Sequence, residues 1–257
     1  MQRRFPNPSK TIFSKRQTYL IVACYQVMAL GFGISSDGSN LAESFKALLA
    51  YNFVLFLGLI LTLTPQRQVL IDWARYRHQK AARRKGLFNL SLLRDLLWGE
   101  KSPAIVAIAL NAAITATILI PWITASFYDN SRLSVLIVLG LSLSLLVMYA
   151  AIAQLVVFMQ AQQQGLWILG VLSAAIILPP LTLGLLSVDI VTEPTLWLFT
   201  VFAFGAIKNA GISSIFIALL GQLSLLTLCS VQMTRQLKKA GASNSTNLFA
   251  PSKALIP

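Results

Sequence analysis

Long apolar runs separated by short polar or basic segments constrain this chain more than any other feature. A helix needs about 20 predominantly apolar residues to cross the hydrocarbon core of a bilayer. Five stretches meet that requirement, at residues 18–35, 45–64, 103–124, 133–160 and 166–188. Only 11% of the 257 residues are charged, whereas a soluble domain carries about 25%. The sequence therefore predicts an all-α, polytopic helical membrane protein.

A final apolar region, residues 196–233, is too long for one span and short for two. Gly205, Lys208 and Gly211 interrupt it near its middle. We expect one last span at about 211–233, preceded by a re-entrant or interfacial element, which makes six transmembrane helices. Two full spans are the alternative.

The distribution of basic residues predicts the orientation of these helices. With six spans and a cytoplasmic N-terminus, every lysine and arginine except Lys46, Arg132 and Lys208 lies on the cytoplasmic side. Cytoplasmic loops are enriched in these residues, so we expect a multi-pass protein of the inner (plasma) membrane with both termini cytoplasmic. The domain organisation then has a basic segment at 1–16, a six-span domain at 17–233 and a disordered tail at 234–257.

The densest basic segment is the cytoplasmic loop at 65–102, which joins the second and third spans. Its first part, RQVLIDWARYRHQKAARRK, has the composition of a helix, and residues 87–98 predict a second, amphipathic helix. One interpretation is a topology anchor that touches anionic lipid, since each lysine or arginine there contributes about 1 kcal/mol. The other is a docking surface for a cytoplasmic protein, because aromatic residues and arginine are enriched at interfaces. The docking residues would be Trp73, Arg75, Tyr76, Arg77, Arg83 and Arg84.

Amides are the main polar side chains inside the predicted spans. They are Gln26, Asn52, Asn111, Gln154 and Gln222. Hydrogen bonds between helices are their simplest role, and contact with a transported substrate is the alternative. In the fifth span, Pro179 and Pro180 each remove a backbone hydrogen bond. We expect a kink or an unwound segment there, with a hinge as its functional form.

Motifs of the common enzyme classes are missing. No GxxxxGK[ST] phosphate loop occurs, so ATP hydrolysis would require another polypeptide. The HExxH, GxSxG and paired-cysteine motifs are also absent. We therefore expect no enzymatic activity, no catalytic residue, no cofactor and no metal site. The net charge of +13 does not indicate nucleic-acid binding, because the basic residues cluster between apolar runs.

The order of these features resembles the transmembrane subunits of type 2 ABC transporters. Three strings, LTPQRQVLIDWARYRHQ, LLWGEKSPAIVAIALNAAI and LLGQLSLLTLCSVQMTRQLKKAG, also look like a cyanobacterial group of ABC transporter permeases. The resemblance implies an amphipathic N-terminal helix at 1–16, a coupling helix within 66–101 and a re-entrant element at about 190–210. It also implies a separate ATP-hydrolysing subunit and a homo- or heterodimer in the membrane. Members of that group are longer, with sequence ahead of the matched part, so a shorter paralogue or a split unit is expected.

Two functions follow as predictions. The first is the permease subunit of an ABC-type transporter, coupled to a separate cytoplasmic ATPase through the loop between spans 2 and 3. The alternative is a non-transporting integral membrane scaffold or assembly factor that holds a partner on the same basic surface.

Overall fold

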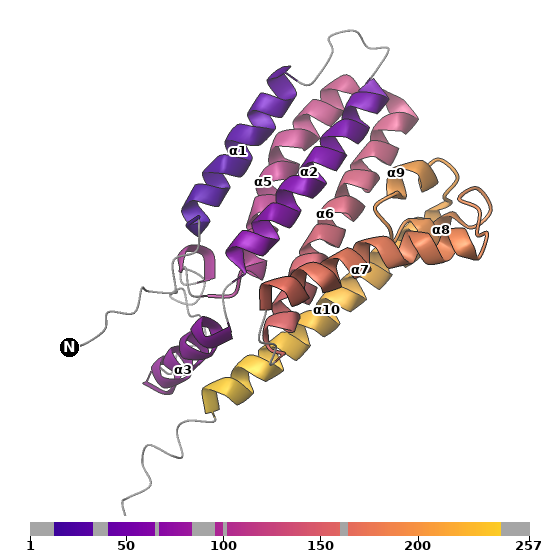
Figure 1. Ribbon diagram of the computed structural model, residues 1–257. Coiled ribbons are helices and arrows are strands. Elements are labelled where there is room, and N and C mark those ends of the chain that lie inside the picture. The colour runs from indigo at the N-terminus through magenta and orange to yellow at the C-terminus, as the bar shows by residue number, and fades with distance from the viewer. Residues whose placement is uncertain are drawn as a thin grey trace, which may run out of the picture.

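The structure is a computed structural model that describes residues 13–32, 41–64, 67–83, 96–99, 102–159 and 164–242. Within these ranges the chain is helical and contains no β-strand. Figure 1 shows how the helices are arranged. They are α1 Lys15–Phe32, α2 Leu41–Leu63, α3 Arg67–Arg83, α5 Ile105–Ser126, α6 Asp129–Val157, α7 Gln164–Leu185, α8 Pro194–Trp197, α9 Ala203–Ala206 and α10 Ile212–Ala242.

Five of these helices are long and apolar enough to cross a membrane. The candidate spans are Leu41–Leu63, Ile105–Ser126, Ser131–Val157, Gly165–Leu185 and Ile212–Ala240. This confirms the predicted class, a polytopic helical membrane protein. α1 is not among the five: it has 18 residues, and its first turn contains Lys15, Arg16 and Gln17. The sixth span and the orientation in the membrane therefore stay predictions.

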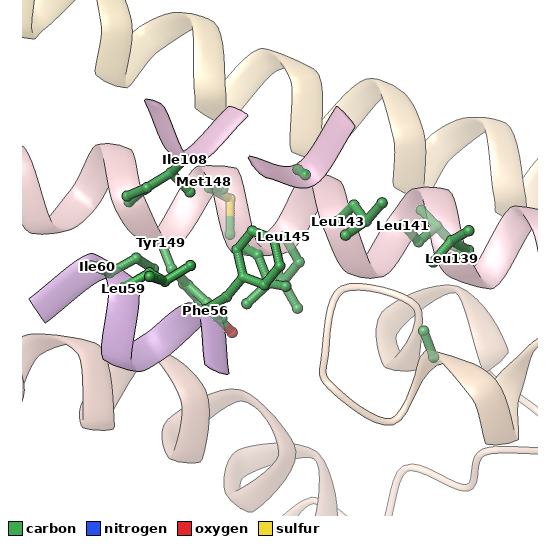
Figure 2. Close-up of a cluster of buried hydrophobic side chains, with 14 of the residues drawn as sticks. Phe56, Leu59, Ile60, Ile108, Leu139, Leu141, Leu143, Leu145, Met148 and Tyr149 are labelled. Carbon is green, nitrogen blue, oxygen red and sulfur yellow. The ribbon is translucent and has the colours of Figure 1, made fainter. Parts of the chain in front are cut away.

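α6 forms the centre of the bundle and packs against α2, α5, α7 and α10. Apolar side chains on several of its faces are buried between Val135 and Val157, as expected for a helix surrounded by others. In Figure 2, Phe56, Leu59 and Ile60 of α2 approach Tyr149 of α6. By contrast, α7 and α10 bury few of their side chains, so most of their apolar surface is available to lipid or to another protein.

The region whose span count was ambiguous contains one long helix. Residues 186–211 form only two single-turn helices, α8 and α9, joined by turns. This segment folds back onto the bundle, where Leu198, Ala203 and Ala206 are buried. α10 then runs for 31 residues, and it is the single candidate span of this region.

α7 continues as a helix through Pro179 and Pro180. The unwound segment expected at these prolines is therefore not observed, because the helical conformation extends across both residues. α7 ends at Leu185, and two residues later Ser187 has a φ of 53°, in the left-handed region. There the N–H of Val188 donates to the carbonyl of Leu183 at 3.0 Å, which is the six-to-one hydrogen bond of a Schellman cap.

Candidate functional site

A cavity of about 830 Å³ lies between α2, α6, α7 and the folded segment at 190–205. Its size falls within the roughly 300–1,000 Å³ of ligand pockets. One face of α2 and one face of α6 form its walls. On each helix most lining residues are three or four positions apart, which places them on the same side of the helix. On α2 they run from Lys46 to Val54, and on α6 from Leu139 to Leu146. Figure 2 shows Leu139, Leu143 and Leu145 spaced along α6.

The lining of this cavity is apolar apart from four side chains. Aromatic rings from Phe53, Trp197, Phe202 and Phe204 contribute to it. The polar lining residues are Lys46, Asn52, Thr115 and Ser142. The cavity can therefore enclose an apolar molecule and offer it few polar contacts.

The cavity occupies the half of the bundle remote from α3. Lys46 lies near the start of α2, whereas α3 follows the other end of that helix. At the start of α2, the Lys46 ammonium contacts Glu43 Oε1 at 2.6 Å. It also lies 5.2 Å from the centroid of the Phe204 ring, and both residues line the cavity.

Three helices meet in a buried amide cluster at the inner wall. The amide of Gln26 on α1 donates to Asn52 Oδ1 on α2 and to Thr115 Oγ1 on α5, the latter at 3.2 Å. The Asn52 amide in turn donates to the Leu48 carbonyl at 3.0 Å. Since Asn52 and Thr115 also line the cavity, this cluster connects its wall to α1.

The other three predicted amides make contacts away from the cavity. Asn111 is buried and donates to Thr18 Oγ1 on α1 at 3.4 Å. Gln222 on α10 donates to the Leu198 carbonyl at 3.4 Å. Gln154 on α6, with its amide oxygen turned toward α5, accepts hydrogen bonds from the backbone N–H groups of Ala104 and Ile105, the latter at 2.6 Å. It thereby satisfies donors that an α-helix leaves unpaired at its start.

A buried lysine fixes the start of α1, at the α3 end of the bundle. Lys15 is only 2% exposed. Its ammonium donates to the carbonyls of Leu96, Ser102 and Pro103 and to Ser102 Oγ, at 2.6–3.2 Å. Burial lowers the pKa of Lys15 to about 8, so the amine is still largely protonated at neutral pH.

Aromatic contacts reinforce this junction between α1 and residues 96–103. The Tyr19 hydroxyl donates to the Leu97 carbonyl at 2.7 Å, and its ring meets Trp98 edge to face at 5.6 Å. The Arg16 guanidinium lies 5.2 Å from the centroid of the same Trp98 ring. The end of the basic loop thus contacts the first turns of α1. The same helix carries Gln26, which belongs to the amide cluster.

α3 presents two different faces. Leu70 and Ala74 are 1% and 6% exposed, in a helix that packs against α10. Gln68, Asp72 and Tyr76 follow one another at four-residue spacing on the opposite face, and all three are exposed. Figure 1 shows α3 beside the C-terminal end of α10.

Three of the predicted docking residues can be placed on α3. Tyr76 lies on the exposed face, and Trp73 and Arg75 lie at its two edges, half-buried. The Arg75 guanidinium pairs with Asp72 Oδ1 at 3.6 Å. The side chains of Arg77 and Arg83, and the whole of Arg84, lie outside the described residues, as do 1–12 and 243–257 of the predicted terminal segments.

The structure groups the predicted residues differently from the sequence. Asn52 and Pro180 both line the cavity, whereas Asn111 does not. Sequence reasoning missed Thr115 and Lys15: the first looks like an ordinary hydroxyl in an apolar run, and the second like one more basic residue of the N-terminal segment. Their polarity was visible, but their partners are 89 and 87 residues away.

Known proteins were compared with this chain at the level of family models, curated sequences and solved structures. None of the three comparisons gives a match. Function must therefore be argued from the geometry of the cavity and of α3.

Proposed function

We propose that this chain is the permease subunit of an ABC-type transporter and that it couples to a separate cytoplasmic ATPase through α3. The proposal includes six spans, the first formed by α1 from Thr18 onward, and cytoplasmic termini in the inner (plasma) membrane. It also takes residues 186–211 as a re-entrant or interfacial element before the last span.

The packing of α3 is the observation that carries this proposal. A helix that anchors a protein to lipid keeps its apolar face free for the bilayer. Here Leu70 and Ala74 are buried within the protein instead. The helix is therefore packed against the bundle, with the face of Gln68, Asp72 and Tyr76 turned outward. Such an arrangement suits a surface that receives a protein partner.

The length of α10 supports the same interpretation. Its 31 residues extend over about 46 Å at 1.5 Å per residue, whereas the hydrocarbon core is about 30 Å thick. The turns that contain Arg235 and Lys239 therefore project beyond the core, where α3 can pack against them. A partner on α3 would thus be connected directly to a membrane-spanning helix.

The test is to purify the tagged chain from its native cells and to measure ATP hydrolysis by the assembly that co-purifies. We expect an ATPase in fixed ratio to the chain, and we expect Tyr76→Ala to lower its recovery or its activity several-fold. Tyr128→Ala is the matched control, because Tyr128 is 76% exposed and lies at the other end of the bundle, at the start of α6. An equal effect of both variants would contradict docking on α3.

A chain that co-purifies with other membrane proteins and with no ATPase would favour the scaffold function instead. In that case the same Tyr76→Ala variant identifies whether the membrane partner uses α3.

A further inference from the structure

We propose that the cavity between α2, α6 and α7 binds one acyl chain of a membrane phospholipid, with the polar end of the lipid at Lys46. This inference rests on the membrane location in the proposed function and deepens it by naming a ligand class for the cavity. It does not depend on the ATPase.

The walls of the cavity select an apolar occupant over water. A buried water needs two to four polar partners. The Asn52 amide is already occupied by the Leu48 carbonyl and Gln26, and Thr115 Oγ1 already accepts from Gln26. The remaining surface is formed mainly by leucine, valine and aromatic side chains. An acyl chain restores the dispersion contacts that an empty space of this size would forfeit.

The cavity is open to the surrounding bilayer. Val54 and Phe202 both line it, yet they are 69% and 54% exposed. Tyr51 on α2 and Leu181 on α7, each adjacent in sequence to a lining residue, are also exposed, and both belong to candidate spans. Lipid is the molecule present at high concentration along these surfaces, so a chain from the bilayer can enter from the side.

The dimensions match one leaflet. From Lys46 to Val54 the lining face of α2 rises about 12 Å, at 1.5 Å per residue. One leaflet contributes about 15 Å of hydrocarbon. The cavity begins at a cation near the start of α2 and continues along apolar side chains toward the middle of the helix. This order, charge first and then apolar wall, is that of a phospholipid with its phosphate at Lys46.

Photolabelling of the intact chain in phosphatidylcholine vesicles tests the proposal. The vesicles contain a phosphatidylcholine that carries a diazirine on one acyl chain, and the labelled residues are mapped by mass spectrometry. Leu139 and Leu146 are 3% and 2% exposed, so lipid at the outer surface of the bundle cannot label them. We expect labelling of both residues, with a diazirine near the glycerol favouring Leu139 and one near the chain terminus favouring Leu146.

Matched variants show whether the label enters through the cavity. Ala50 lines the cavity, and Ala50→Phe should lower labelling of Leu146 at least threefold. Ala113 is exposed on α5 and lies outside the cavity lining, so Ala113→Phe should leave that labelling unchanged. Labels confined to the exposed faces of α7 and α10, or a reversed depth order, would overturn the proposal.

The outcome is separable from that of the transport proposal. Absence of labelling in the cavity removes the lipid and leaves transport of another compound standing. Labelling in the cavity, combined with the absence of any ATPase partner, supports the lipid site and removes the permease.

Discussion

Replacing Lys15 by methionine tests how the start of α1 is held against the end of the basic loop. Methionine keeps the length and much of the volume of the side chain, but it cannot donate a hydrogen bond. The carbonyls of Ser102 and Pro103, each about 3 Å from the Lys15 ammonium, lose that donor. An unsatisfied buried carbonyl costs about 1–3 kcal/mol, so the two together cost about 2–6 kcal/mol.

The burial of a charge opposes that cost, and the pKa of Lys15 gives its size. Burial lowers this pKa from 10.5 to about 8, and each pKa unit corresponds to 1.36 kcal/mol. At pH 7 the buried charge therefore destabilises the wild-type fold by about 3 kcal/mol. Lys15→Met removes this term, so at pH 7 the two effects largely offset each other, and the stability of the variant should lie between about 3 kcal/mol below and about 1 kcal/mol above that of the wild type.

The free energy of unfolding of the wild type should rise relative to that of Lys15→Met at alkaline pH. Between pH 8 and 10 the unfolded chain binds more protons at Lys15 than the folded chain does, so the stability of the wild type rises with pH. From pH 8 to pH 10 this term amounts to about 2 kcal/mol, and methionine has no counterpart to it. The other titrating groups are shared by both proteins and cancel in the comparison.

The measurement is the free energy of unfolding in bicelles, by titration with sodium dodecyl sulfate, at pH 7, 8, 9 and 10. Lys208→Met is the control for exchanging a lysine for methionine, because the Lys208 side chain is exposed. If the advantage of the wild type over Lys15→Met shrinks above pH 8, the ammonium itself is the stabilising form and the reasoning from burial is refuted.

Three further substitutions, one of them with a matched control, test local contacts and backbone strain by the same assay. Gln154→Leu leaves the first N–H groups of α5 unsatisfied and should cost about 1–3 kcal/mol; a neutral effect would contradict the cap. At Gly221 a Cβ would lie 2.5 Å from the Phe199 ring, so Gly221→Ala should cost about 1–3 kcal/mol. Gly140→Ala meets nothing within 4 Å and should be neutral or gain up to about 1 kcal/mol; similar losses in both would refute the clash. Ser187→Gly relieves a left-handed residue and should stabilise the protein by about 0.5–1 kcal/mol, whereas a loss would show that the serine side chain matters more than the backbone strain.

The helices of the membrane bundle could be predicted well because lipid leaves the backbone little choice. In hydrocarbon every N–H and C=O must be satisfied within the segment, so an apolar run of sufficient length becomes a helix. The run expected at 45–64 forms α2, Leu41–Leu63, and the run expected at 166–188 forms α7, Gln164–Leu185. Even the two adjacent prolines of α7 do not interrupt its helix.

The site could not be predicted in the same way, because its contacts join distant parts of the chain. The sequence shows that Gln26 and Asn52 are polar, but nothing in their own segments indicates that Thr115 completes their cluster. The prediction for Lys15 had a different weakness. The ammonium of a lysine before an apolar run normally reaches the membrane–water interface and stays solvated. The ammonium of Lys15 is instead buried, and it donates to the carbonyls of Leu96, Ser102 and Pro103.

The position of α3 against α10 also has a consequence for biogenesis. α3 is made before α5, α6, α7 and α10, so a ribosome must synthesise all of these helices before the partner helix of α3 exists. Until then Leu70 and Ala74 have no surface to cover them, and the outward face of α3 has no fixed orientation. A protein that recognises this face would therefore distinguish chains that contain α10 from shorter ones, and the assembly of a complex would wait until α10 has been made.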